Sequence, residues 1–346
     1  MKSIAFYRYL LGGLLMAITA ACSGSDDDNI VPTPTDDTPK TVRLTITQID
    51  DEGSAGVRLL DGTRATLNES GKTLLPSWKK DDVLSYCNLK SYPYSYGNLT
   101  ANTTARTSSF TGDVKCEEKD NLAVVYPATT FIVGNGKLQP YTISLDGQDG
   151  TLETLATKFH HVYGLATVNE VRGTEANATM TTKSLLTVCK FSFIEFIDKD
   201  NNNDITVKEL KISYDLGVTY TESYPEIDPE TGHETYPLVS CRATSYPHSA
   251  TVRLLDNDNN AIAQNNVHAT PVAPDADNTP LIVTLKSASK DVYVALLPTP
   301  TGATEKIHFK FEVTDESNQT YSGTARAYLH EGEYVVAENL KLTKTN

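Results

Sequence analysis

The sequence predicts an all-β protein built from two stacked β-sandwiches, and two patterns support this. Residues 41–49 (TVRLTITQI) alternate polar and apolar side chains with period two, as a half-buried strand does. Turn clusters such as Gly134-Asn135-Gly136 separate many similar runs, a spacing typical of sandwiches. Only residues 151–161 (TLETLATKFHH) predict a short helix. The further strands are expected at Val83–Leu89, Leu122–Tyr126, Thr142–Leu145, Leu186–Ile197, Ile205–Tyr214, Thr251–Leu255, Leu281–Leu285, Val292–Leu297, Ile307–Val313, Thr320–Tyr328 and Tyr334–Leu342.

The first 21 residues predict a secretory signal peptide. Lys2 and Arg8 form a basic start, and a mainly apolar stretch runs from Leu10 to Ala21. That stretch is shorter than the roughly 20 apolar residues of a membrane span. Its length and the small residues at its end favour a cleaved signal.

The signal ends in a motif that predicts lipid attachment. Thr19-Ala20-Ala21-Cys22 resembles a bacterial lipobox, in which the Cys is acylated and becomes the new N-terminus; an ordinary cleaved signal is the alternative. Acyl chains contribute about 0.8 kcal/mol per buried methylene, so a multiply acylated Cys22 would anchor the chain without a spanning helix. The acidic run in residues 23–28 (SGSDDD) resembles the surface-export signal of Bacteroidetes lipoproteins, and it would also serve as a solvated tether. Residues 22–40, rich in Pro, Thr and Asp, are expected to be a flexible tether to a body exposed at the surface of the outer membrane.

Length and charge limit the number of domains and the kinds of partner that the protein can have. From residue 41 about 300 residues remain, enough for two domains, which we place at 41–175 and 176–346. The formal net charge is -14, and removal of Lys2 and Arg8 with the signal makes it -16. Nucleic-acid binding needs Lys and Arg to neutralise phosphate, so this acidic chain is not expected to bind nucleic acid.

Four cysteines lie in the body: Cys87, Cys116, Cys189 and Cys241. An exported location permits disulfides, and Cys87 and Cys116 fall on neighbouring predicted strands and could pair. Buried free thiols are an equal alternative. No Cys-x-x-Cys is present, so a zinc ribbon or a redox site is unsupported.

The segment 198–209 has the residue spacing of a calcium-binding loop. Asp198 to Glu209 fits the ligand spacing of an EF-hand loop but lacks its central Gly. The flanks predict strands, and Asp/Asn clusters are typical of hairpin turns, so we favour a turn over calcium. The cluster Asp256-x-Asp258-x-Asn260 repeats the pattern without a later Glu. The sequence shows no motif for a nucleophile, a phosphate loop or a histidine metal site, so we expect no enzyme activity, metal or cofactor.

Several short motifs are spaced along the body of the chain. In chain order they are Thr63-Arg64-Ala65-Thr66, Trp78-Lys79-Lys80-Asp81-Asp82, Phe110-Thr111-Gly112, Val124-Val125-Tyr126-Pro127, Gln148-Asp149-Gly150-Thr151, Tyr293-Val294-Ala295-Leu296-Leu297-Pro298 and Gly332-Glu333-Tyr334. Together they resemble the fimbrillin family, the type V pilins of Bacteroidetes. Asp81 stands where that family usually has Gly, within a Trp-x-x-Gly-Asp motif.

The resemblance implies two transthyretin-like, Greek-key sandwiches and an assembly mechanism. In such pilins an Arg-specific protease removes the first strand, and a donor strand from the next subunit takes its place. Residues 41–49 would be the removable strand, and Arg64–Ala65 matches the position of the cut, with Arg58 as the second choice. Strand addition would satisfy the exposed backbone groups and the apolar surface.

The resemblance also implies a role. Stalk subunits carry extra donor strands after the second sandwich, whereas this sequence stops at Asn346 just after a predicted strand, so we expect a tip or minor fimbrial subunit that mediates adhesion. Its partners would be other fimbrial subunits, the outer membrane and a glycan or protein ligand on a host or bacterial surface. The alternative is a lipid-anchored carbohydrate-binding lipoprotein of a glycan-uptake system. The Tyr-rich segments Tyr86–Tyr96 and Thr219–Pro247 are the candidate recognition loops for either role.

Overall fold

Strands make up nearly all of the regular structure, so the all-β prediction is confirmed. The computed structural model describes residues 41–48, 66–70, 73–90, 93–198, 201–215, 219–223, 226–227, 234–235, 238–242, 248–272, 279–299 and 306–345, all within a compact unit that spans Pro39–Asn346. The helical elements among them are α1 (Leu152–Thr154), the π-helix η1 (Leu155–Phe159) and the 3-10 helix η2 (Gln264–Asn266). The expected helix at 151–161 is therefore present, and the Thr151 side chain accepts a hydrogen bond from the backbone N–H of Thr154 at its start.

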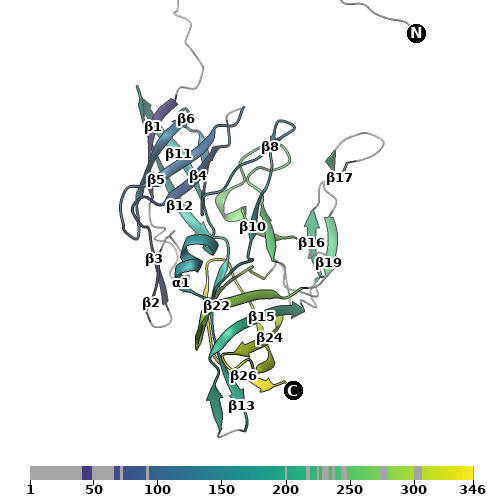
Figure 1. Cartoon of the computed structure of the whole chain (residues 1–346). Coiled ribbons are helices and arrows are strands. Elements are labelled where there is room, and N and C mark those ends of the chain that lie inside the picture. Colours follow the sequence, from purple (N-terminus) through teal and green to yellow (C-terminus); the bar gives the residue numbers. More distant parts are fainter. Residues whose placement is uncertain are drawn as a thin grey trace, which may run out of the picture. The chain divides into compact units, whose positions relative to one another are not determined.

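The first half of the described chain forms a closed barrel (Figure 1). The strand order around it is β1-β12-β11-β7-β4-β5-β6, so the first strand of the chain lies between β6 and β12. Closure leaves no open sheet edge, which is how a barrel differs from the sandwich that we expected. The strands are β1 (Thr41–Gln48), β4 (Val83–Asn88), β5 (Tyr96–Ala101), β6 (Ser109–Lys115), β7 (Asn121–Tyr126), β11 (Val162–Arg172) and β12 (Glu175–Ser184).

The domain boundary expected after residue 175 falls at the first residue of a barrel strand. β12 pairs with β11 in an antiparallel register and with β1 in a parallel register. The barrel therefore continues to Ser184, and the next sheet begins at Thr187.

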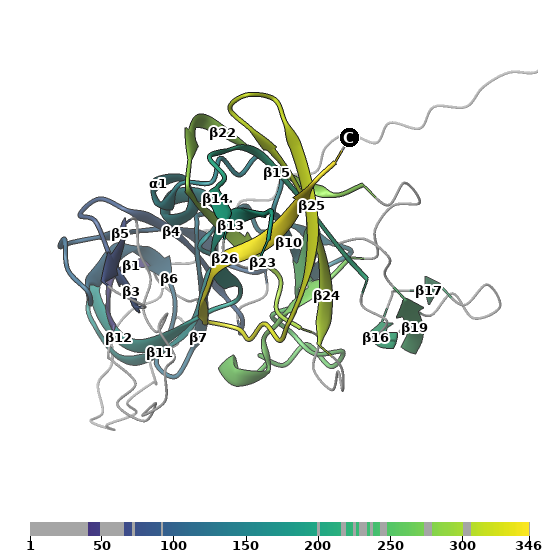
Figure 2. The same cartoon turned by 90° about the horizontal axis from the view of Figure 1, so that it is seen from below.

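The second half forms a strongly curved sheet with the order β14-β13-β26-β25-β24-β15-β22, and β23 pairs with β13 (Figure 2). β13 and β26 run parallel, and the other pairings of this sheet are antiparallel. The strands are β13 (Thr187–Phe196), β14 (Asn202–Asp204), β15 (Val207–Asp215), β22 (Leu281–Ser289), β23 (Asp291–Leu296), β24 (Ile307–Asp315), β25 (Thr320–Ala327) and β26 (Tyr334–Lys344).

Smaller sheets and hairpins connect these elements. A three-stranded sheet has the order β10-β20-β21, and four two-stranded pairs are β2–β3, β8–β9, β16–β19 and β17–β18. Their bounds are β2 (Thr66–Ser70), β3 (Thr73–Ser77), β8 (Val133–Gly134), β9 (Lys137–Leu138), β10 (Tyr141–Ser144), β16 (Thr219–Ser223), β17 (Glu226–Ile227), β18 (Glu234–Thr235), β19 (Leu238–Arg242), β20 (Ser249–Val252) and β21 (Ala269–Pro271).

Two hydrophobic clusters form the core. One fills the barrel and includes Trp78 and Phe110, and the other includes the side chains of the second sheet. The β2–β3 hairpin contributes Leu67 and Leu74 to the second cluster, although the hairpin precedes most barrel strands in the sequence. Trp78, one residue after β3, returns to the barrel cluster. The chain therefore crosses from one core to the other within the few residues around the end of β3.

Candidate functional site

β1 fills the space between β6 and β12, which we call the β1 slot. Its register with β12 is parallel and pairs Arg43 with Glu175 through to Gln48 with Met180. Its register with β6 is antiparallel and pairs Thr41 with Lys115 through to Thr47 with Ser109. β1 is therefore paired along both edges, and its departure would expose the facing edges of two strands.

One face of β1 is buried in the barrel. Val42, Leu44 and Ile46 are 2%, 0% and 0% exposed, whereas Arg43 and Thr47 lie on the solvent side. The period-two pattern of the sequence is thus the burial pattern of the strand. Burial of such side chains contributes roughly 1.5–3 kcal/mol each, and any strand with the same alternation would supply it.

The side of the slot formed by β6 is shaped by Phe110 and Gly112. Phe110 pairs with Ile46 and is fully buried, and Gly112 pairs with Leu44. A Cβ on Gly112 would lie 2.6 Å from the backbone oxygen of Asn98 and 2.9 Å from Leu99 Cδ2. Only glycine fits there, which gives the Phe-x-Gly motif a structural reason.

The inward position at the end of β1 is polar. Gln48 is 5% exposed, and its Oε1 accepts a 2.6 Å hydrogen bond from Trp78 Nε1, while its Nε2 donates a 3.1 Å bond to Thr182 Oγ1. Trp78 is fully buried and packs edge-to-face on Phe110 and Tyr126, with ring centroids 4.7 and 5.5 Å apart. A side-chain amide therefore satisfies two polar groups inside an otherwise apolar barrel.

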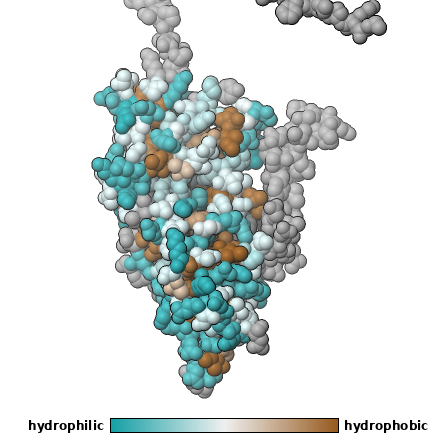
Figure 3. All heavy atoms as spheres, in the orientation of Figure 1, coloured by the Kyte–Doolittle hydropathy of each residue, from teal (hydrophilic) through white to brown (hydrophobic). Residues whose placement is uncertain are grey.

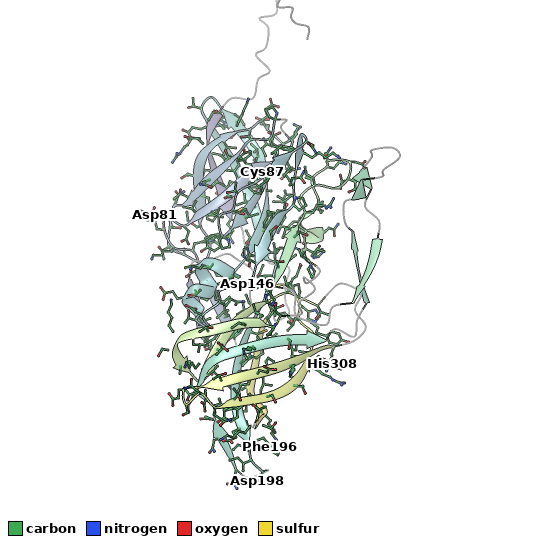
Figure 4. All side chains as sticks on the ribbon, turned by 45° about the vertical axis from the view of Figure 1, so that its right-hand side comes forward. Asp81, Cys87, Asp146, Phe196, Asp198 and His308 are labelled. Atoms are coloured by element: carbon green, nitrogen blue, oxygen red, sulfur yellow. The ribbon has the colours of Figure 1, made fainter. Side chains whose placement is uncertain are left out.

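The turn after Trp78 adopts the conformation that glycine favours. Asp81 has φ +72°, which lies in the left-handed region, and it is labelled in Figure 4. The Asp82 carboxylate accepts a 2.7 Å hydrogen bond from the backbone N–H of Lys79. Asp81 therefore adopts this conformation at a cost in backbone strain.

The β2–β3 hairpin is joined to the second sheet by a carboxylate. Glu69 in β2 accepts hydrogen bonds from Lys190 in β13 at 3.1 and 3.3 Å, from Tyr293 in β23 at 2.6 Å and from Tyr334 in β26 at 2.8 Å. Lys190 also lies 3.2 Å from Asp291. Glu69 and Lys190 are 21% and 12% exposed, so this cluster is largely protected from solvent.

The surroundings of Glu69 change its acidity. Burial alone would raise the pKa of Glu69, but the hydrogen bonds from Tyr293, Tyr334 and Lys190, with the charge of Lys190, lower it below the ordinary value. Glu69 thus binds Tyr293, Tyr334 and Lys190 as the ionised carboxylate. The cluster contributes to stability above the ordinary carboxyl pKa and loses that contribution in acid.

A second contact with the curved sheet comes from the Gln-x-Gly-Thr motif. Buried Gln148 accepts a 2.7 Å hydrogen bond from the backbone N–H of Ala295 and donates a 3.0 Å bond to the carbonyl of the same residue. Its amide therefore pairs with β23 as a residue of a neighbouring strand would. Gly150 has φ +74°, and its carbonyl accepts a hydrogen bond from Tyr293 N–H at 3.0 Å.

Asp149 in the same motif accepts hydrogen bonds from its own turn. Thr151 Oγ1 and Thr154 Oγ1 each donate to it at 2.7 Å, and Lys286 Nζ of β22 lies 3.1 Å away. Burial alone would raise the pKa of Asp149, but these bonds outweigh that effect and lower it to about 2. The motif thus joins its turn to the curved sheet through the ionised Asp149 carboxylate, and we call it the joint at Asp149.

The residues predicted for lipid attachment and cleavage lie outside the described residues. These are Cys22, Arg58, Arg64 and Ala65. The segment 49–65 that contains both arginines connects β1 to β2. Acylation and cleavage therefore stay predictions, and the structure gives the strands on either side of the expected cut.

The disulfide alternative for Cys87 and Cys116 is wrong, and the free-thiol alternative holds for both. The two residues and Cys189 are free and buried. β5 lies between the strands that carry or precede Cys87 and Cys116, and their side chains belong to different hydrophobic clusters. Burial raises the pKa of Cys87 to about 12 and that of Cys116 to about 11. The side chain of Cys241 lies outside the described part of the chain.

The calcium-like segment is part of a hairpin. β13 and β14 pair antiparallel from Ile194–Asp204 to Phe196–Asn202, and Asp198 accepts hydrogen bonds from Asn201 at the turn (Figure 4). The flanks are strands and not helices, so the hairpin interpretation is confirmed. Asp256 likewise accepts backbone hydrogen bonds from Asp258 and Asn260 at 2.9 and 2.8 Å, as a turn residue does. Across the described ranges, no group of three or more His, Cys, Asp or Glu could hold a metal ion.

The Tyr-rich segment 86–96 does not form an aromatic platform around Tyr86. That side chain is 3% exposed and donates a 2.9 Å hydrogen bond to the Asp113 carbonyl, whereas Tyr96 is 52% exposed. The side chains of 219–247 lie outside the described residues. The face shown in Figure 3 is mostly polar, with small separate apolar spots.

The sequence analysis does not identify Gln48, Thr182 or Glu69 as site residues. Gln48 could have been found from the sequence, because it is a polar residue at the inward position of a period-two strand. Glu69 could not, since its partners lie 121 to 265 residues away in the sequence.

None of the family models matches the chain, and no curated protein sequence matches it. Solved structures are similar to it at low identity. A protein described as a cell adhesion protein from Bacteroides uniformis has 12% identity and a TM-score of 0.47, covering 90% of this chain and 98% of that one. A fimbrial protein from Bacteroides ovatus has 8% identity and a TM-score of 0.36, covering 86% of this chain and 48% of that one. A further protein described as a cell adhesion protein, from Bacteroides eggerthii, has 11% identity and a TM-score of 0.36, covering 88% and 87%.

Within the described residues, no helix is long and apolar enough to span a membrane.

Proposed function

We propose that the chain is a fimbrial subunit of the cell surface that exchanges its first strand for a donor strand and mediates adhesion. The observation that carries this proposal is the placement of β1. It is the first described strand, it is paired along both edges, and it is joined to the rest through a segment that contains Arg58 and Arg64. Its function is one of binding and assembly and not of catalysis.

The slot has the properties that strand exchange requires. Removal of β1 would expose the edges of β6 and β12 and an apolar surface that includes Phe110 and Leu99. Unpaired backbone groups and apolar surface both favour the addition of a new strand. A donor strand with alternating apolar residues would restore the closed barrel.

β2, the strand after the predicted cut, is held in place by contacts with the second sheet. A cut between Arg64 and Ala65 would leave a new N-terminus one residue before β2. Glu69 binds that hairpin to three strands of the second sheet. Cleavage would therefore break the covalent link to β1, so that a donor strand could displace it, while the hairpin stays bound to the second sheet.

The last described strand is engaged in its own sheet. β26 pairs with β13 in a parallel register from Val188–Tyr334 to Glu195–Leu342, and with β25 at Tyr321 and Ser322. It is therefore unsuited to donation while the second sheet is intact. This supports an acceptor role, and a tip or minor position in the fimbria stays a prediction.

N-terminal sequencing of the mature protein from the cell surface tests the proposal. We expect delivery by an acylated Cys22 at the outer membrane, followed by a new N-terminus at Ala65, and an Arg64→Gln variant that keeps its original N-terminus. If all of the protein on assembled fimbriae retains the acylated N-terminus, strand exchange is excluded.

A further inference from the structure

One of the four inward positions of the β1 slot is polar. Three inward positions of β1 hold Val42, Leu44 and Ile46, which contact an apolar interior. The fourth holds Gln48, whose amide bonds to Trp78 and Thr182. The first three demand only apolar side chains, whereas the fourth demands a hydrogen-bond acceptor and a donor together.

The departure of β1 would leave an indole N–H without its partner. Trp78 is fully buried, and its ring is packed against Phe110 and Tyr126. Its Nε1 hydrogen bond at 2.6 Å is to Gln48, which would leave with the strand. A donor strand with an apolar residue at this position would seal the N–H inside the barrel, and a buried unsatisfied donor is costly.

We propose that Trp78 and Thr182 select the donor strand by requiring a side-chain amide, best a Gln, six residues after its first inward apolar residue. This inference rests on the proposed strand exchange and names the chemistry of its partner: a strand that is apolar at three alternate positions and carries an amide at the fourth. Gln suits both contacts, because Oε1 accepts from the indole and Nε2 donates to the threonine hydroxyl.

The amide also fixes the register of the incoming strand. A one-residue slip would turn the apolar residues to solvent, so the period-two pattern already excludes it. A two-residue slip keeps the apolar face inward and is not excluded by the pattern. It would, however, place the residue equivalent to Ile46 against Trp78 Nε1, so the polar position distinguishes the correct register from this slip. A single buried Asn fixes the register of coiled coils in the same way.

The test uses the mature chain cut after Arg64 and a labelled peptide of residues 41–49. Binding of the peptide in competition with the released strand is measured by fluorescence anisotropy. Trp78 is the only tryptophan of the sequence, so its emission reports independently on occupancy of the slot. We expect the Gln48→Leu peptide to bind at least tenfold more weakly than the parent peptide, and a tenfold change corresponds to 1.4 kcal/mol. The matched control is a Thr47→Ala peptide, altered at a solvent-facing position, which should bind within about twofold of the parent.

Variants of the protein assign the preference to its two contacts. Thr182→Val removes the hydroxyl and should reduce the Gln-over-Leu preference several-fold, and Trp78→Phe should reduce it further. Thr182→Val alone keeps the test valid if Trp78→Phe does not fold. Equal binding of the parent and Gln48→Leu peptides would overturn this inference and leave strand exchange intact. If the parent peptide does not enter the cut chain, strand exchange itself fails.

Discussion

β1 and β2 lie on either side of residues 49–65, and they are held in different ways. β1 is attached by two backbone ladders and by apolar side chains that many sequences could supply. β2 is attached through Glu69, whose carboxylate has three side-chain partners on three strands of the second sheet. The first attachment is general and replaceable, with Gln48 as its specific contact inside the barrel and Arg43 in an exposed pair with Asp113, whereas the second is specific to one residue. A cut between them would therefore separate a strand that can be exchanged from a hairpin that must stay.

The largest expected effect is in β1, where volume and not identity should matter. Leu44→Ala removes a fully buried side chain opposite Gly112 and should lower the free energy of unfolding by about 3 kcal/mol. Leu44→Met keeps the volume and should cost less than about 1.5 kcal/mol. Urea denaturation measures both. A loss of equal size in the two variants would show that β1 is not held by general apolar packing.

In β2 the opposite behaviour is expected. Glu69→Gln keeps the size of the side chain but removes the charge that binds Lys190, so we expect a loss of about 2 kcal/mol in urea denaturation. The control is Glu312→Gln, which breaks an exposed pair with Lys310 and should change stability by less than about 0.5 kcal/mol. If both variants behave alike, the specific attachment of β2 is refuted.

The joint at Asp149 should show a defined pH dependence. Since its pKa is lowered to about 2, the carboxylate stabilises the fold above its ordinary pKa of 3.8, and this contribution is lost as the pH falls toward 2. Asp149→Asn should therefore cost about 1–2 kcal/mol at pH 7, and the difference from the parent should shrink between pH 4 and pH 2. The exposed Asp113→Asn is the control, with a small difference at every pH. A difference that stays constant through acid would exclude ionised Asp149 as the cause.

The smallest expected effect is at the turn before β4. Asp81 has φ +72°, so Asp81→Gly should relieve strain and stabilise the barrel by about 0.5 kcal/mol, net of the greater freedom of the unfolded chain. Thermal unfolding at several urea concentrations would resolve the change. A clear destabilisation would mean that the Asp81 side chain has a role beyond the turn.

The local pattern predicted many of the strands but missed β5, β6, β11 and β12 of the barrel, and it did not predict the strand order. Period two predicted the buried face of β1 because alternation depends only on neighbouring residues. The parallel pairing of β1 with β12 joins segments more than 130 residues apart, and no local pattern encodes it. The choice between a Cys87–Cys116 disulfide and free thiols stayed open for the same reason, since it depends on β5 lying between β4 and β6.

The polar contacts of the site show the same limit. Gln48 is a polar residue at an inward position of an alternating strand, but its partner Thr182 lies 134 residues away. Glu69 lies in a short hairpin with no pattern of its own, and its partners come from the second half of the chain. The sequence indicates that a buried polar side chain needs a hydrogen-bond partner, but the partner can be identified only from the fold.

Hydrogen–deuterium exchange of the chain that begins at Cys22, before and after a cut at Arg64, tests the central claim most directly. We predict that after the cut, with excess unlabelled peptide of residues 41–49, the original β1 amides lose protection and leave with the released fragment. The amides of residues 66–77 should keep their protection, because Glu69 still holds the β2–β3 hairpin. Loss of protection in the hairpin while β1 remains protected would contradict the account.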